Sequence, residues 1–323
     1  MKKILFILVT VVLTLALLSG CSAGGKEADE GDGRLRVVTT IFPEYDWVMN
    51  ILGDNPGEVQ VSMLLDNGVD LHSYQPTVDD ILNISTCDVF VYVGGESDAW
   101  VESAMSGAVN KDMAAVNLLE VLGEQVKEEE MVEGMQKEDE GEEEEGYDEH
   151  VWLSLRNAVL LCDSICDALV LKDPAHGEIY KKNCAEYKEK LAALDEEYGK
   201  AVAEARFDTL LFGDRFPFRY MLDDYGLEYY AAFAGCSSES EAGFDTITFL
   251  AGKADELMLP AVLTIDGSDG KIAQTIVDNT KTGDKKVLVL DSMQSITSED
   301  IKNGRTYLSV MRDDLAVLKE ALN

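Results

Sequence analysis

Two of the three histidines of this chain lie where loops lead into helices, in surroundings that favour metal binding. His72 lies between an expected strand and an expected helix, and His150 follows an acidic segment and precedes another helix. Such junctions often carry functional groups, and imidazole is a ligand for Zn²⁺ and other transition metals. Because histidine is scarce in this chain, the sequence predicts that these two residues share one metal site. We expect the third, His176, at the surface.

The N-terminus has the pattern of an export signal. Two lysines precede an apolar run at residues 4–18, which is shorter than the roughly 20 residues that a membrane-spanning helix needs. The run ends in Leu18-Ser19-Gly20-Cys21, which resembles the processing site of bacterial lipoproteins. The resemblance implies cleavage before Cys21 and acylation of its thiol. The alternative is an incidental cysteine in an N-terminal anchor helix. We expect an extracytoplasmic protein that is anchored by lipid to a bacterial membrane.

Composition narrows the possible partners and activities. The chain has 323 residues and a formal net charge of −35. A surface this acidic repels nucleic acid, so we exclude that class of partner, and it concentrates cations around the protein. The sequence has no His-Glu-x-x-His, Gly-x-Ser-x-Gly or phosphate-loop motif. Catalysis therefore has little support, and we do not expect an enzyme.

Five cysteines remain besides Cys21. Because five is an odd number, at least one of them has no disulfide partner within the chain. They are Cys87, Cys162, Cys166, Cys184 and Cys236. Cys162 and Cys166 are four residues apart on an expected helix and share a face. A metal cluster there is one interpretation, but no Cys-x-x-Cys pair supports it. The sequence favours the interpretation that both cysteines are buried and pack as small hydrophobic side chains.

The elements that must position these residues alternate between strands and helices. In the first half we expect strands at 36–41, 59–65 and 89–93 and helices at 45–52 and 77–84. In the second half we expect strands at 209–212, 227–233, 261–265 and 287–290 and helices at 217–225, 244–257, 271–280 and 307–322. This alternation indicates βαβ units and mostly parallel sheets.

Two longer helical patterns, at 156–171 and 175–205, lie between these halves. The second would be about 45 Å long and could run across two lobes. The predicted fold class is therefore α/β, with two βα lobes joined by one long backbone helix. The predicted division is a signal peptide at 1–20, a lipidated tether at 21–34, an N-terminal lobe at 35–172, a linking helix at 173–205 and a C-terminal lobe at 206–323. The cleft between such lobes is a natural ligand site.

The segments around the two histidines resemble the histidine motifs of zinc and manganese ABC-transporter solute-binding lipoproteins. They read His72-Ser73-Tyr74-Gln75-Pro76-Thr77 and Asp148-Glu149-His150-Val151-Trp152-Leu153-Ser154. Supporting similarities occur at 91–95, 225–227, 272–276 and 287–291, and the resemblance runs from about 35 to 322. It implies capture of Zn²⁺, or alternatively Mn²⁺, between the two lobes, and we expect the protein to be a monomer. It further implies delivery to an ABC permease and its cytoplasmic ATPase.

The resemblance also implies four protein ligands. Two match His72 and His150, and an acidic ligand after the final strand matches Asp291. The remaining position, usually His or Glu, falls on Arg215, which cannot lose its proton to ligate a metal. Asp214 is the candidate replacement, with Arg215 pairing with a ligand carboxylate from outside the site. Otherwise the site has three protein ligands and water, or has lost tight binding.

The acidic segment at 128–149 holds 13 acidic residues and one basic residue, Lys137, which predicts a disordered loop. Three interpretations remain open for it: a solvated insertion, a weak collector of cations for His150, or a contact to the transporter. Two other functions also remain open, a zinc-dependent extracellular hydrolase and a surface adhesin on the same scaffold.

Overall fold

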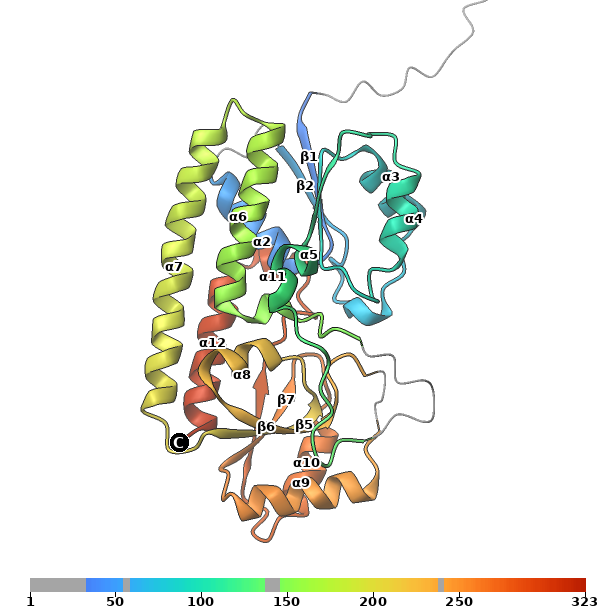
Figure 1. Cartoon of the computed structure of the whole chain (residues 1–323). Coiled ribbons are helices and arrows are strands. Elements are labelled where there is room, and N and C mark those ends of the chain that lie inside the picture. Colours follow the sequence, from blue (N-terminus) through green and yellow to red (C-terminus); the bar gives the residue numbers. More distant parts are fainter. Residues whose placement is uncertain (1–32, 55–58, 137–145, 238–240) are drawn as a thin grey trace, which may run out of the picture. The chain divides into compact units, whose positions relative to one another are not determined.

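A computed structural model of the chain describes residues 33–54, 59–136, 146–237 and 241–323 (Figure 1). The predicted signal peptide, the predicted tether up to residue 32 with Cys21, and residues 137–145 of the acidic segment lie outside the described residues. In the described part of the chain, no helix is both long and apolar enough to cross a membrane. Residues from Leu35 to Asn323 form one compact unit, and the following description concerns that unit.

The N-terminal half contains a four-stranded parallel sheet in the order β2-β1-β3-β4. Its strands are β1 (Leu35–Thr39), β2 (Val59–Met63), β3 (Val89–Tyr92) and β4 (Ala114–Asn117). Its helices are α2 (Phe42–Leu52), α3 (Val78–Thr86), α4 (Trp100–Ser106) and α5 (Leu118–Leu122), with short 3-10 turns η2 (Leu71–Ser73), η3 (Gly123–Gln125) and η4 (Val151–Leu153). The central strand β3 is buried along most of its length, as is typical of a parallel sheet that is covered on both faces.

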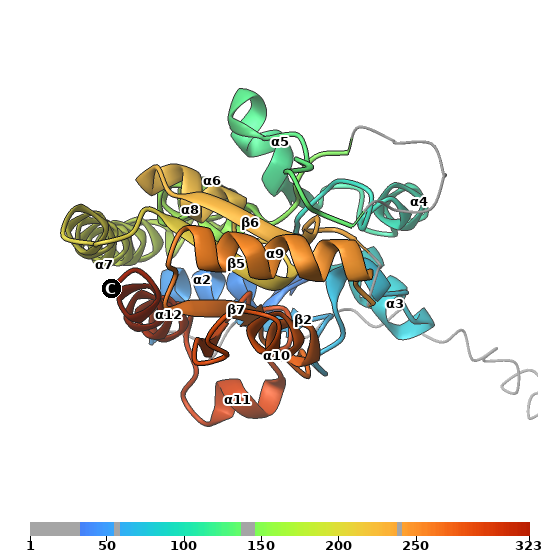
Figure 2. The same ribbon diagram turned by 90° about the horizontal axis from the view of Figure 1, so that it is seen from below.

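The C-terminal half repeats this arrangement, with a parallel sheet in the order β6-β5-β7-β8. Its strands are β5 (Thr209–Arg215), β6 (Glu228–Phe233), β7 (Ala261–Ile265) and β8 (Lys286–Leu290). Its helices are α8 (Arg219–Tyr225), α9 (Phe244–Glu256), α10 (Lys271–Asp278), α11 (Ser298–Lys302) and α12 (Tyr307–Ala321). In Figure 2, α9 and α10 lie across the strands of this sheet.

In the sequence, α6 (Leu155–Lys172) and the 27-residue helix α7 (Gly177–Ala203) lie between the two sheets. Helix α7 extends along both halves, packs against α6 and α2, and meets α12 near its C-terminal end (Figures 1 and 2). One stripe of α7 is buried and consists of Tyr180, Cys184, Tyr187, Leu191, Leu194 and Tyr198. Spacings of three and four residues place these side chains on a single face, which is the pattern of an amphipathic helix. The predicted fold of two parallel-sheet lobes joined by a long helix is confirmed.

Apart from the 3-10 turns, four short elements, α4, α5, α11 and β4, were not expected from the sequence. Strand β4 reads Ala-Ala-Val-Asn, and only Val116 in it is buried. A strand this short, with two alanines, has neither the alternating pattern nor the β-branched run that predicts a strand.

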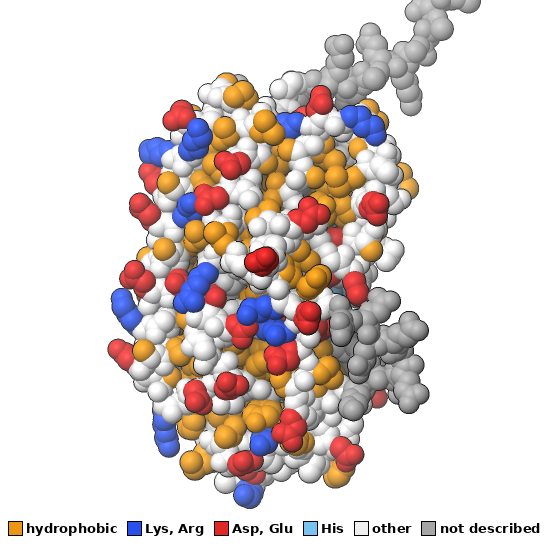
Figure 3. Space-filling view, in the orientation of Figure 1, with side chains coloured by type: hydrophobic (Ala, Val, Ile, Leu, Met, Phe, Trp, Pro, Cys, Tyr) orange, Lys and Arg blue, Asp and Glu red, His pale blue; other side chains and the backbone are white. Residues whose placement is uncertain are grey.

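The prediction of a disordered acidic loop is wrong for its described ends. The Glu129 N–H donates to the Gly146 carbonyl at 2.9 Å, and the Asp148 N–H donates to the Lys127 carbonyl at 2.9 Å. These backbone bonds pair the two ends with each other. Side chains then attach them to the second half of the chain, because Glu130 pairs with Arg219 and Glu129 Oε1 accepts the Cys236 N–H. On the face seen in Figure 3, acidic side chains are spread among lysines and arginines and do not gather in one patch.

Candidate metal centre

His72 lies in the turn η2, after β2, with its backbone fixed by its neighbour. The His72 N–H donates to Asp70 Oδ1 at 3.0 Å, which caps the turn. On the ring, Nδ1 lies 2.8 Å from Ser97 Oγ and 3.7 Å from Glu149 Oε2. The Nδ1 edge is thus held by neighbouring polar atoms, while Nε2 faces another ring.

That ring belongs to His150, which is fully buried at the start of η4. Asp148 Oδ1 accepts both the backbone N–H and the Nδ1–H of His150, each at 2.9 Å. The segment is also fixed from the C-terminal half, because the Tyr220 hydroxyl donates to the Asp148 carbonyl at 2.8 Å and the Trp152 indole N–H donates to the Ser292 carbonyl at 2.9 Å. Since the carboxylate occupies Nδ1, the neutral His150 ring presents a lone pair at Nε2.

The two Nε2 atoms lie 3.1 Å apart. Desolvation by burial lowers the pKa of His72 to about 4, and the nearby His150 contributes in the same direction. Both effects disfavour a second positive charge at this contact. At neutral pH the His72 ring is therefore neutral, and one of the two facing Nε2 atoms can donate a hydrogen bond to the other. A metal ion is the other species that satisfies two facing imidazole nitrogens.

Cys236 is the third potential ligand in this place, and the sequence did not single it out. Among the described residues, one group of histidine, cysteine and acidic ligand atoms is close enough to hold one ion: His72, His150 and Cys236, all within 4.8 Å of one another. The available signal was its position three residues past β6, because ligands of α/β proteins gather beyond the carboxyl ends of parallel strands. All five described cysteines are free, and Cys162 and Cys166 are buried as predicted.

The predicted ligand Asp214 and its neighbour Arg215 lie at the end of β5. Asp214 Oδ1 accepts the Arg215 N–H at 2.9 Å, and Oδ2 accepts the Thr264 hydroxyl. The Arg215 guanidinium pairs with Asp70, with Nη2 and Oδ2 2.7 Å apart. Burial alone would raise the pKa of Asp70, but Arg215 and His72 hold it below its ordinary value. Arg215 therefore bonds the residue that caps His72, and pairs with neither Asp214 nor Asp291.

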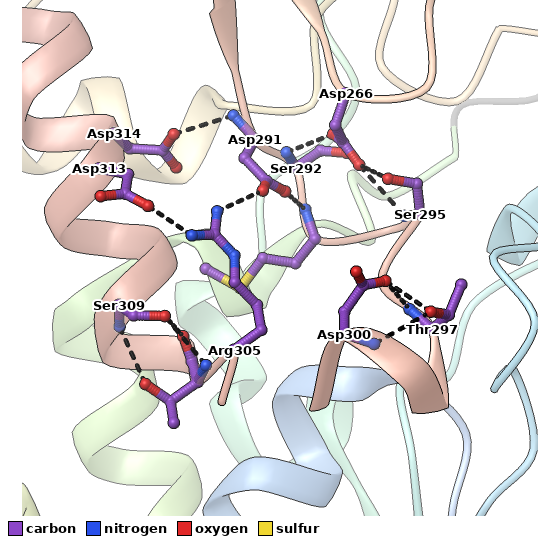
Figure 4. A network of polar contacts seen from close by, with 12 residues as sticks. Asp266, Asp291, Ser292, Ser295, Thr297, Asp300, Arg305, Ser309, Asp313 and Asp314 are labelled. Atoms are coloured by element: carbon purple, nitrogen blue, oxygen red, sulfur yellow. Dashed lines mark hydrogen bonds and ion pairs between the residues drawn. The ribbon is translucent and has the colours of Figure 1, made fainter. Parts of the chain in front are cut away.

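The other predicted ligand, Asp291, follows β8 and lies in a polar network (Figure 4). Its Oδ2 accepts from Arg305 Nη2 at 2.9 Å, and its Oδ1 accepts the Met293 N–H at 2.8 Å. Burial and the neighbouring Asp266 raise the pKa of Asp291, and Arg305 opposes that rise. Asp214 and Asp291 both lie outside the group that surrounds the histidine pair, and their assignment as ligands stays a prediction.

A cavity of about 990 Å³ opens beside His72. Its lining comes from both halves of the chain and includes Asp70, His72, Asp214, Arg215, Cys236 and Asp266. The second half contributes residues at or just after the carboxyl ends of β5, β6 and β7, so these ends of the parallel strands face the cavity beside His72. The cavity is therefore the ligand crevice expected of an α/β fold.

This fold and site define a two-lobed α/β binding protein with a histidine pair beside the cavity to which both halves contribute. The sequence model of the ZnuA family, described as zinc-uptake complex component A, periplasmic, matches residues 37–321. The chain belongs to this family.

Individual relatives agree with that assignment. The zinc-binding lipoprotein AdcA of Streptococcus pneumoniae is 30% identical over 99% of this chain and 61% of its own length. The chain thus spans about three fifths of this curated relative. The high-affinity zinc uptake system protein ZnuA of Bacillus subtilis is 29% identical over 98% of this chain and 97% of its own length.

Solved structures show the same fold. The metal-dependent lipoprotein YcdH of Bacillus subtilis aligns with a TM-score of 0.73 and 28% identity over 90% of this chain and 99% of its own. The Zn(II)-bound ZnuA-like domain of Streptococcus pneumoniae AdcA aligns with a TM-score of 0.70 and 28% identity over 90% and 99% of the two chains.

Proposed function

We propose that this chain captures Zn²⁺ outside the cytoplasm and delivers it to an ABC permease that is driven by a cytoplasmic ATPase. The names of its relatives, which bind or take up zinc, support this assignment. The observation that carries it is the 3.1 Å separation of the His72 and His150 Nε2 atoms. Two nitrogens bound tetrahedrally to Zn²⁺ at roughly 2.0–2.1 Å lie about 3.3 Å apart, so the pair is almost at ligand spacing before the ion arrives.

Further ligands would come from the second half of the chain. We keep Asp214 and Asp291 as the proposed carboxylate ligands. Asp214 lines the same cavity as His72. Asp291 would have to release its hydrogen bond from Arg305 before its carboxylate could bind the ion. Ligands from both halves would make zinc stabilise one arrangement of the two lobes, and the permease could distinguish that arrangement from the metal-free one.

Zinc is favoured over manganese because the two fixed ligands are imidazoles, whereas Mn²⁺ prefers oxygen donors. Four protein ligands would close the coordination sphere and leave no position for a reacting water, so the site serves a receptor and not an enzyme. We also propose that acylated Cys21 anchors the protein to the membrane. Replacing Cys21 with alanine should release it from the membrane fraction of expressing cells, and its retention there would contradict the anchor.

Calorimetric titration of the metal-stripped protein tests metal capture. We expect one tight Zn²⁺ site and weaker Mn²⁺ binding in the unchanged protein, and loss of tight binding in His72→Ala and His150→Ala. His176→Ala is the matched control because it removes the one remaining histidine, which pairs with Asp173 at the start of α7. Equal zinc affinity in all four proteins would contradict the proposal.

Delivery requires a separate measurement in cells. Uptake of radioactive zinc should be supported by the unchanged chain and by the His176 variant, and lost with both site variants. If uptake persists without the two histidines, the chain does not supply the permease through this site.

A further inference from the structure

We propose that the Cys236 thiolate, in place of Asp214, is the third protein ligand of the same ion, beside the two ring nitrogens of His72 and His150. This inference rests on the proposed function and specifies the chemistry of its site. It assigns to the C-terminal half a ligand that lies beside the histidine pair even without metal.

The geometry brings the sulfur close to both rings. Cys236 lies on the cavity wall, and its Sγ and the ring nitrogens of His72 and His150 lie within 4.8 Å of one another. A tetrahedral zinc ion with Zn–S of about 2.3 Å and Zn–N of about 2.0–2.1 Å needs an N–S separation of roughly 3.6 Å. A movement of roughly 1 Å, within the reach of a side-chain rotation, therefore closes the three donors around one ion.

The backbone before Cys236 is shaped for this approach. A Cβ atom on Gly235 would lie 2.8 Å from the Phe216 carbonyl oxygen and 3.3 Å from two atoms of the His150 ring. Only glycine lets the chain pass so close to His150 without displacing it. The Cys236 N–H donates to Glu129 Oε1 at 2.7 Å, so one described end of the acidic segment also holds the cysteine in place.

The competing donors at the end of β5 are already engaged. Both oxygens of Asp214 accept hydrogen bonds, from the Arg215 N–H and the Thr264 hydroxyl. The guanidinium of Arg215 carries no lone pair for a metal and is bonded to Asp70. Of the groups that follow the strands of the second sheet, the Cys236 sulfur is the donor that lies within the histidine group.

Binding through sulfur changes the protonation of the site. A thiol must lose its proton to bind a metal. When the Zn–S bond forms, the S–H bond breaks and one proton leaves to solvent or to Glu129, with no change in oxidation state. A thiolate also strengthens discrimination against Mn²⁺, which binds soft donors poorly.

Replacing zinc with Co²⁺ tests directly whether the Cys236 sulfur binds the metal, because cobalt bound to a thiolate has a characteristic absorption band. Co²⁺ in the unchanged protein should give an intense near-ultraviolet thiolate-to-metal charge-transfer band, and Cys236→Ser should lose that band. Zn²⁺ affinity of this variant should fall by more than about 100-fold, beyond the 10–100-fold that loss of an outer partner of a ligand causes. Cys166→Ser, which removes a cysteine from α6, is the matched control and should keep both the band and the affinity.

A second measurement needs no variant and therefore does not depend on how Cys236→Ser folds. Saturating Zn²⁺ should protect Cys236 of the unchanged protein from alkylation, as followed by mass spectrometry. Cys87, Cys162, Cys166 and Cys184 are buried and serve as internal references whose labelling should not respond to the metal.

The outcomes separate this inference from the proposed function. Tight zinc binding that needs both histidines, without a charge-transfer band and without protection of Cys236, overturns the thiolate ligand and leaves zinc capture standing. Absence of tight zinc binding in the unchanged protein overturns the proposed function and the thiolate ligand together. A band and protection that both disappear on metal removal support the site of two nitrogens and one sulfur.

Discussion

Asp148 and His150 form a closed local pair, in which one carboxylate oxygen accepts both the backbone N–H and the ring Nδ1–H of the histidine at 2.9 Å. The pair fixes both the tautomer and the orientation of a ring that is fully buried. The acidic residue two positions before the histidine thus fixes the ring of a proposed ligand.

Replacing Asp148 with asparagine should weaken zinc binding by about 10–100-fold, because the negative charge that makes the imidazole a stronger donor is lost. Calorimetric titration measures this change. Asp173→Asn is the matched control, since Asp173 forms the same kind of pair with His176 away from the cavity, with Oδ2 and Nδ1 2.6 Å apart. Equal zinc affinities for the Asp148 variant and the unchanged protein would show that the pair is only structural.

Arg215→Gln should raise zinc affinity by about fivefold. The guanidinium is a fixed positive charge beside His72, and its removal takes away a repulsion of about 1 kcal/mol on an incoming cation. Proton competition does not cancel this gain at pH 7, because the pKa of His72 starts from about 4.

The same variant should lose about 1 kcal/mol of folding stability with its ion pair to Asp70. Arg156→Gln is the control, because Arg156 pairs with Asp195 and Asp224 and does not line the cavity. Weaker zinc binding in the Arg215 variant would contradict this prediction. It would mean that the ion pair of Arg215 with Asp70 favours zinc binding more than the positive charge of Arg215 opposes it.

Gly235→Ala should destabilise the fold by about 1–3 kcal/mol and weaken zinc binding, because the new methyl group meets the Phe216 carbonyl and the His150 ring. Urea unfolding and metal titration report the two effects. Gly252→Ala on α9 is the control with the opposite sign. A methyl group at Gly252 meets nothing within 4 Å, and alanine in a helix is worth about 0.5–1 kcal/mol over glycine.

Glu44 should make stability fall as the pH rises. Desolvation by burial, with a contribution from Asp98, raises its pKa from 4.5 to about 8. Between these values the folded protein holds a proton that the unfolded chain has released. The contribution of Glu44 is therefore fully present below pH 4.5 and is lost as the pH approaches 8, at about 1.4 kcal/mol per pH unit.

Glu44→Gln imitates the protonated carboxyl and removes this slope. Its Oε1 can accept the Thr40 and Ile41 N–H groups that now bond Glu44 Oε2. In urea unfolding at several pH values, the stability of the variant relative to the unchanged protein should rise from pH 5 to pH 8. The exposed Glu102→Gln should show no such trend, and a constant difference for Glu44→Gln would contradict a buried protonated carboxyl.

The sequence by itself determined the two-lobed fold and the histidine pair. Strands such as β7 were located to the residue because buried parallel strands are continuous β-branched and aliphatic runs. Helix α7 was recognisable from its spacing of buried residues. These patterns are local, because the apolar periodicity of a helix or strand depends only on residues that are close in the sequence. The motifs around His72 and His150 are local in the same sense.

The tertiary structure alone decided which groups meet the two rings. Cys236 had no distinguishing neighbours in the sequence, and its place beside His150 depends on the order of the strands and on the close approach at Gly235. Arg215 faced Asp70 for the same reason, since the two residues lie 145 positions apart. Pairings over such distances follow from how the two halves of the chain pack against each other. No local pattern encodes them, because they are set by the burial and packing of the whole chain.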